Sequence, residues 1–199
     1  CDGAVDEIHN CACDDDGCGP TIPFPELTIG PYRDGVSTLV NNILSQFTNL
    51  NVNDTYAHSA RIGYVLQAVS AFLWAGREYV IPRRADLIAA AIREVAELEM
   101  AAGLVVGGGP AFGLPDAWDA FGDGSENPAM TAYTWQSGMV ALGVAKLARF
   151  LVDAGHPSAA SVRQFGVELV EYWRPYYTAV EAGGWYWYSH RQSDAIAVH

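Results

Sequence analysis

Hydrophobic positions recur at helical spacing along most of the chain after about residue 32, and they predict five helices. The predicted helices run from about Asp34 to Leu50, Asp54 to Trp74, Arg83 to Ala102, Pro128 to Ala154 and Ser158 to Val180. Glycine follows three of these ranges within two residues, as is typical of helix ends. Ser193-Asp194 is expected to begin a sixth helix, which His199 cuts short.

The predicted helices alternate between two types. The second and fourth are apolar on most sides, whereas the third and fifth each carry one polar face. A helix that is apolar on most sides needs neighbours on most sides. A ring of helical hairpins supplies them, with inner helices surrounded and outer helices half exposed. The pattern therefore predicts an all-α fold of (α/α)-toroid type, and the two and a half hairpins predict a part-toroid or a fragment.

Residues 1–31 differ from the helical domain predicted over residues 32–199. They are polar at first and then rich in proline and glycine, which predicts an irregular leader. All four cysteines lie in this leader, at Cys1, Cys11, Cys13 and Cys18.

The cysteines admit three interpretations. Two disulfides would place the protein in an oxidising compartment. Cys11, Cys13 and Cys18 with His9 would be an unusually spaced zinc site. Cys1 before an Asp-rich stretch is also typical of a lipidated mature end, which would leave an odd number of thiols. Disulfides and lipidation both predict an extracytoplasmic protein that is secreted, periplasmic or lipid-anchored at the cell surface.

The charge balance excludes one class of partner. The chain has 11 basic and 23 acidic residues, for a net charge of −12. Nucleic-acid binding needs clustered lysine and arginine, so we expect no nucleic-acid partner. No apolar run predicts a convincing membrane span, so any membrane contact would be through a lipid on Cys1.

Four consecutive aromatic residues, Trp185 to Tyr188, lie between a glycine pair and a His-Arg dipeptide. On a core strand, both faces would then carry large rings with polar tips that need partners. A sugar-binding surface uses such rings, because pyranose C–H faces stack on aromatic planes. The run indicates either a carbohydrate contact or a β-hairpin whose rings close the end of the helical domain.

The loops that enter the inner helices of a toroid all lie at one end. Here these loops span residues 51–56, 104–128 and 183–193, and they hold the most unusual residues of the chain. Polar and aromatic groups that converge on one opening are typical of a glycan cleft. The predicted substrate-binding residues are Trp118, Trp135, Gln136, Trp185, Tyr186, Trp187 and Arg191.

Two short motifs resemble those of a known group of enzymes. They are Thr134-Trp135-Gln136-Ser137-Gly138-Met139 and Gly184-Trp185-Tyr186-Trp187-Tyr188, the latter followed by Asp194 and His199. They are similar to inner-helix motifs of (α/α)-toroid carbohydrate enzymes, namely glucuronyl C5-epimerase-like proteins and toroidal polysaccharide lyases. The resemblance covers about residues 54–199, and it implies a glycan that contains uronic acid.

Removal of the C5 proton of a uronate needs a base, together with a cation or amide that neutralises the carboxylate. The predicted catalytic residues are Tyr133, His190, His199 and Tyr188. Arg191 and Gln136 are the predicted partners of the carboxylate. Packing is the alternative role of each of these side chains.

Hydrolysis would instead use two carboxylates across a glycosidic bond. Asp119, Asp123 and Glu126 are available, with Asp116 nearby, and the same oxygen-rich loop is a candidate for calcium. A solvated loop is the alternative. No other cofactor is expected, because P-loop, dinucleotide and metalloprotease motifs are missing.

The sequence thus predicts a lyase or epimerase that acts on a uronate-containing polysaccharide. Two alternatives use the same aromatic residues. One is a non-catalytic glycan-binding lipoprotein, and the other is a structural or assembly protein whose aromatic end contacts another subunit.

Overall fold

The computed structural model describes residues 29–47, 51–75, 81–119, 122–181, 183–191 and 197–198. The chain divides into two compact units, Cys1–Gly35 and Val36–His199. The four cysteines and His9 lie outside the described residues, as do Asp194 and His199. Disulfides, a zinc site and a lipidated Cys1 therefore stay predictions, and so does a catalytic role for His199.

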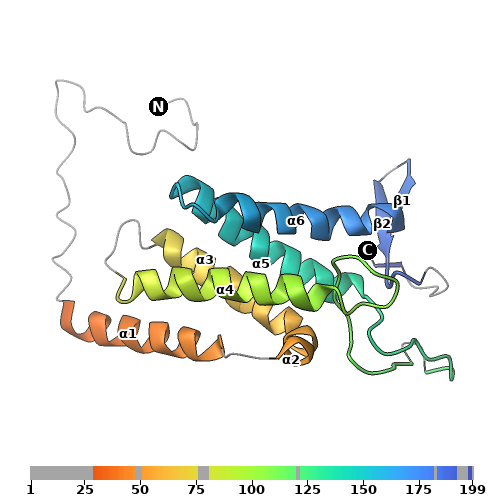
Figure 1. The fold of residues 1–199 in the computed structure, drawn as a ribbon, viewed down its shortest axis with the longest axis horizontal. Helices are drawn as coiled ribbons and strands as arrows, with labels where there is room; N and C mark the ends of the chain where they lie inside the picture. Colours follow the sequence, from red (N-terminus) through yellow and green to blue (C-terminus); the bar gives the residue numbers. More distant parts are fainter. Residues whose placement is uncertain are drawn as a thin grey trace. The chain divides into compact units, whose positions relative to one another are not determined.

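The described residues are mainly helical, which confirms the prediction of a helical protein (Figure 1). The helices are α1 (Ile29–Gln46), α2 (Val52–Ala57), α3 (Ser59–Ala75), α4 (Arg84–Ala102), α5 (Thr134–Asp153) and α6 (Ala159–Trp173), followed by the 3₁₀ turn η2 (Arg174–Tyr176). The strands β1 (Tyr177–Val180), β2 (Gly183–Trp187) and β3 (Ala197–Val198) form an antiparallel sheet in the order β1-β2-β3.

The predicted helix from Asp54 to Trp74 is two helices, α2 and α3. Asn51 caps α2, because its side-chain oxygen accepts a hydrogen bond from the backbone N–H of Asp54 at 3.0 Å. His58 leaves helical geometry between the two helices, with φ −102° and ψ 10°. A change of direction within one apolar run leaves the periodicity almost intact, so the pattern did not predict it.

Other predicted helices also differ from the structure, including the first, which runs from Ile29 to Gln46 instead of from Asp34 to Leu50. The helix predicted from Pro128 begins at Thr134, because the preceding residues pair with other loops. The helix predicted to reach Val180 ends at Trp173, where Pro175 interrupts it and Tyr177–Val180 becomes a strand. Ala197–Val198 is a strand beside Tyr186 and Trp187, not part of a sixth helix.

Two glycines let α3 and α5 approach until their backbones touch. A Cβ atom at Gly63 would lie 2.6 Å from the carbonyl oxygen of Met139. A Cβ atom at Gly143 would lie 2.5 Å from the carbonyl oxygen of Gly63. Only glycine fits at such distances, so this pair sets the crossing of α3 and α5.

The other helices pack around this contact. Helix α6 lies along α5, and α2 packs against α4 (Figure 1). The largest fully buried side chains include Tyr56, Phe112, Phe150 and Phe165, which join the helices and the loop after α4 into one core.

Helices α3 and α5 are not buried on all sides by the described residues. Tyr64 on α3 is 53% exposed, and Leu142 on α5 is 46% exposed. The core of the described residues therefore leaves part of the apolar surface of α3 and α5 exposed.

Glu94 is the one acidic side chain among the fully buried residues of the described chain. It lies on α4 with 1% of its surface exposed, and Nη2 of Arg93 is 3.8 Å from its Oε1. Burial raises the pKa of Glu94 to about 7; the nearby Glu97 adds to the rise, and Arg93 opposes it. The folded protein therefore holds this proton over a pH range in which the unfolded chain has released it.

We expect Gly143→Ala to lower the free energy of unfolding by about 1–3 kcal/mol or more, because the new methyl group meets backbone that cannot move aside. Gly138→Ala is the matched control on α5, since a Cβ atom there meets no atom within 4 Å. The control should be neutral or more stable by about 0.5–1 kcal/mol. Thermal and urea unfolding measure both changes, and equal stability of the two variants would contradict the glycine contact.

Glu94 should make stability fall as pH rises. The unfolded chain loses this proton near pH 4.5 and the folded protein near 7, so the free energy of unfolding drops between these values by roughly 3–4 kcal/mol. Urea unfolding at a series of pH values should show this slope in the native protein and its loss in Glu94→Gln. Glu99→Gln, at an exposed position of the same helix, should keep it. An unchanged slope in Glu94→Gln would exclude this carboxyl as its source.

Candidate functional site

Three segments of the chain meet at the N-terminal end of α5, and we call this region the mouth. It comprises residues 112–118, 131–137 and 185–191. Isolated bridges pair Gly113 with Ala132 and Tyr133 with Ser189. The N–H of Tyr133 donates to Phe112 O at 2.9 Å, and the N–H of His190 donates to Ala132 O at 3.2 Å. These bonds fix the three segments relative to one another.

Ser137 joins the first turn of α5 to the loop that follows α4. Its buried hydroxyl accepts from the N–H of Phe112 at 2.9 Å and donates to the carbonyl of the same residue at 3.0 Å. Gly113 lies so close to the carbonyl of Thr131 that a Cβ atom could not fit. The mouth is therefore built on buried backbone contacts as well as on side chains.

Three aromatic rings from the three segments contact one another. The ring centroids of Trp118 and Tyr133 are 5.5 Å apart, those of Trp118 and Tyr188 are 5.9 Å apart, and those of Tyr133 and Tyr188 are 5.3 Å apart. Tyr133 is 1% exposed and Trp118 is 37% exposed. The cluster thus presents Trp118 to solvent, while Tyr133 lies in its interior.

His190 lies beside a second group of aromatic residues at the end of α6. The Tyr172 hydroxyl and His190 Nδ1 are 3.1 Å apart, within hydrogen-bonding distance. The ring of Tyr176 is tilted against the imidazole, with centroids 6.5 Å apart. The structure thus joins the predicted residue His190 to Tyr172, which the sequence analysis missed. The run of Tyr172, Tyr176 and Tyr177 around Pro175, just before the aromatic strand, was the available signal.

Two tyrosines near these aromatic groups have raised pKa values. Burial raises the pKa of Tyr56 above its ordinary value; the backbone of Gly113 opposes this and Tyr133 adds to it. Burial also raises the pKa of Tyr172, with further contributions from Tyr176 and Tyr56. Both phenols therefore stay protonated at neutral pH and are not phenolate bases. The Tyr172 hydroxyl lies within hydrogen-bonding distance of His190, whereas no hydrogen bond within the described residues satisfies the buried Tyr56 hydroxyl.

The predicted aromatic run forms β2 and the residue that follows it. Tyr186 pairs with Tyr177 of β1, and their ring centroids are 5.0 Å apart. Tyr186 also packs on the hydrophobic core, where with Trp173 and Ser137 it lines a cavity of about 160 Å³. Successive side chains of a strand point to opposite faces, so Trp185 and Trp187 lie opposite Tyr186. The hairpin therefore closes the end of the core with one ring and keeps two indoles on its other face.

Other predicted site residues have different surroundings. Trp135 is 52% exposed, whereas Gln136 is buried, with no hydrogen-bond partner for its Oε1 among the described residues. The side chain of Arg191 is exposed, and its backbone N–H donates to Ser189 Oγ at 3.1 Å. Of the two predicted carboxylate partners, Arg191 is thus the accessible one.

The acidic loop between Trp118 and Asn127 is organised by its own carboxylates. Asp119 accepts from the N–H of Gly122 at 2.7 Å and of Gly124 at 2.8 Å. Hydrogen bonds from the side chain and backbone of Ser125 lower the pKa of Asp123. The described residues hold no group of three His, Cys, Asp or Glu that could bind a metal ion. Calcium binding and hydrolysis by this loop stay predictions.

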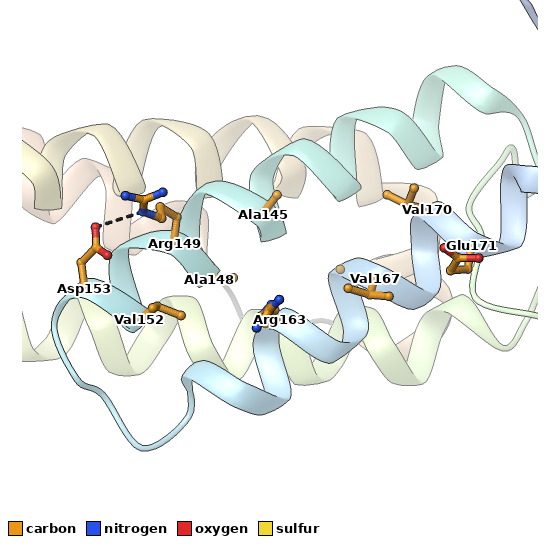
Figure 2. Close-up of a pocket in the computed structure, with 10 residues that line it drawn as sticks. Ala145, Ala148, Arg149, Val152, Asp153, Arg163, Val167, Val170 and Glu171 are labelled. Atoms are coloured by element: carbon orange, nitrogen blue, oxygen red, sulfur yellow. Dashed lines mark hydrogen bonds and ion pairs between the residues drawn. The ribbon is translucent and has the colours of Figure 1, made fainter. Parts of the chain in front are cut away.

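A groove of about 530 Å³ lies between α5 and α6, away from the mouth (Figure 2). Val152, Val167 and Val170 line it and are each about half exposed. The ion pair of Arg149 and Asp153, with 3.1 Å between Nε and Oδ2, lies at its edge. The groove uses none of the mouth residues, and the sequence analysis did not predict it.

Comparison of the chain with models of protein families, with curated proteins and with solved structures found no match in any of the three. Within the described ranges, no helix has the length and apolar character needed to cross a membrane.

Ser137→Ala should destabilise the protein by about 1–3 kcal/mol, because it leaves the buried N–H of Phe112 without its partner, while the Phe112 carbonyl keeps its bond from the N–H of Tyr133. Ser45→Ala is the control, since Ser45 is exposed and bonds only to Asn42 O in its own helix. It should change stability by less than about 0.5 kcal/mol. Chemical denaturation measures both, and hydrogen exchange of the Phe112 amide should speed up only in Ser137→Ala.

Proposed function

We propose that this chain is an extracytoplasmic carbohydrate-active protein, a lyase or epimerase that acts on a uronate-containing polysaccharide. The observation that carries the proposal is the position of His190. Its imidazole lies at the mouth, 3.1 Å from the Tyr172 hydroxyl and in the same segment as Tyr188 of the aromatic cluster. A base held beside aromatic surface is what proton removal from a bound sugar needs.

In the proposed reaction His190 takes the proton from C5 of a uronate. The electron pair of the C–H bond moves towards the carboxylate, whose negative charge Arg191 would balance. In a lyase this pair then forms the C4–C5 double bond as the C4–O bond breaks, and the leaving oxygen takes up a proton. In an epimerase a proton returns to C5 from the opposite side. Tyr188 and His199 are the remaining predicted acids and bases.

Exposed indoles support a sugar surface. Trp118 is 37% exposed and Trp135 is 52% exposed, and both belong to the mouth. We propose that these rings, with Trp185 and Trp187, stack on pyranose faces. Tyr133 and Gln136 are buried, so they would support the surface from below rather than touch the polymer.

We further propose an (α/α)-toroid arrangement for the helices. In this arrangement α3 and α5 are neighbouring inner helices, and α4 and α6 are outer ones. The close contact of α3 with α5 and the packing of α6 on α5 support it. The resemblance of the motifs around Trp135 and Trp185 to toroidal epimerases and lyases points the same way.

The second candidate is a glycan-binding protein without catalysis. The exposure of Trp118 and Trp135 favours it, because stacking needs accessible rings but no base. In this case the bond between Tyr172 and His190 would serve packing alone.

The test is an assay of the purified protein against alginate, pectate, heparan-type and glucuronan polymers in heavy water. A lyase raises near-ultraviolet absorbance, and an epimerase incorporates deuterium at C5. We expect His190→Ala to lower turnover by about 10²–10⁴-fold with binding retained. Trp118→Ala should weaken binding by roughly 0.5–1.5 kcal/mol.

His156→Ala is the matched control, because His156 lies in the turn after the opposite end of α5. This variant should turn over each polymer that the native protein turns over, and at the native rate. Binding without exchange or cleavage would support the glycan-binding candidate. If none of the polymers binds, the carbohydrate proposal is wrong.

A further inference from the structure

We propose that the groove between α5 and α6 is a docking surface for an acidic amphipathic helix of a partner protein. The groove shares no residue with the mouth. The inference therefore goes beyond the proposed function, and its test does not depend on any polysaccharide.

Both helices turn a periodic apolar stripe towards the groove. On α6, Arg163, Val167 and Val170 follow at intervals of four and three residues, which places them on one helix face. On α5, Ala145 and Val152 are two turns apart and share a face in the same way. The three valines are 46–55% exposed. Such spacing normally buries a helix face against a neighbour, yet the described residues leave these side chains half uncovered.

The groove has the dimensions of a helix contact. Its lining spans Ala145–Asp153 of α5 and Arg163–Glu171 of α6, and each stretch is roughly 13 Å long, or about two and a half turns. The small residues Ala145, Ala148 and Gly166 are among those that line it, so a third helix can approach closely. A helix that docks in a groove uses anchors at i, i+3 or i+4 and i+7, and two turns supply them.

A second groove lies on the other side of α5, against α3. It has a volume of about 590 Å³, and Ala71, Trp74 and Lys146 are among the residues that line it. The two grooves share Ala145 and Arg149, so they adjoin along α5. The uncovered surface thus extends over three helices. A small-molecule site encloses most of its ligand, so this open surface favours a macromolecular partner.

The charge balance selects an acidic partner. Residues 134–176, from α5 to η2, hold four basic and three acidic residues, whereas the rest of the chain holds seven basic and 20 acidic residues. The groove therefore lies on a weakly positive region of a chain whose net charge is −12. Carboxylates of a partner would be attracted to this region and repelled by most others.

One cation of the groove is available to such a partner. Arg149 is paired with Asp153, whereas Arg163 has no ion-pair partner in the described part of the chain. Figure 2 shows Arg163 between Val152 and Val167 along the groove. A carboxylate on a docked helix would therefore meet a guanidinium beside its apolar anchors.

The same charges argue against two other occupants. A second copy that docked through the same face would bring two positive faces together. A nucleic acid needs clustered lysine and arginine, whereas valine and alanine supply most of this lining.

The test uses two designed helical peptides of about 18 residues, each with leucine at i, i+4, i+7 and i+11. The positions beside the leucine face are glutamate in one peptide and lysine in the other. Fluorescence anisotropy of the labelled peptides, titrated with the whole chain, measures both affinities. We expect the glutamate peptide to bind at least about tenfold more tightly than the lysine peptide.

Two variants place the binding in the groove. Arg163→Glu should weaken binding of the glutamate peptide about tenfold or more and strengthen binding of the lysine peptide. Val167→Asn keeps the charge but removes an apolar anchor, so it should weaken the glutamate peptide as well. Arg61→Glu is the matched control, because Arg61 bonds to Gln46 of α1 and does not line the groove. The control should leave both affinities unchanged, and thermal unfolding checks that each variant is folded.

Several outcomes overturn the inference. They are a glutamate peptide that does not bind, equal binding of the two peptides, and an Arg163→Glu variant that binds as the native protein does. Self-association of the native chain that Val167→Asn abolishes, measured by sedimentation, would instead make the face an interface between copies. Binding to vesicles that contain phosphatidylglycerol, lost in Val167→Asn and unaffected by the glutamate peptide, would make it a lipid contact.

Discussion

The backbone contact between α3 and α5 is the constraint on which the rest of the described fold depends. Gly63 and Gly143 each face backbone atoms of the other helix at distances that leave no room for a side chain. The contact fixes the position of α5, and the first turn of α5 carries Ser137 and Thr134. These two residues tie down the loop after α4 and the end of the aromatic strand. The position of the mouth thus depends on a contact between the backbones of two helices.

The mouth combines rigid backbone with closely packed phenols. The bridges at Gly113, Tyr133 and Ser189 leave the three segments little freedom to slide. Tyr56 and Tyr172 remain protonated because burial disfavours their charged forms. Of these two neutral hydroxyls, that of Tyr172 lies beside the imidazole of His190.

The helices could be predicted because each buries a periodic apolar face, and the spacing of apolar residues within the segment is enough to indicate that face. The helix limits at Pro128 and Val180 could not be predicted, because pairing with distant segments replaces the helical hydrogen bonds there.

For the site, the aromatic run and His190 stood out through unusual composition. Tyr172 did not, since on α6 it follows the same apolar spacing as a core residue. Its bond to His190 exists only once the hairpin folds back. The burial of Tyr133 and Gln136 likewise depends on the loop that covers the start of α5.

Two segments that adjoin the mouth differ in how they would tolerate insertions and deletions. The segment from Trp118 to Asn127 is closed by its own paired ends and by Asp119, so residues added at its exposed tip would leave the scaffold in place. The hairpin from Tyr177 to Trp187 has no such freedom. One extra residue would turn Tyr186 away from the core and move His190 off Tyr172. Length variation among descendants of this sequence would therefore accumulate in the acidic loop, while the hairpin would keep its residue count.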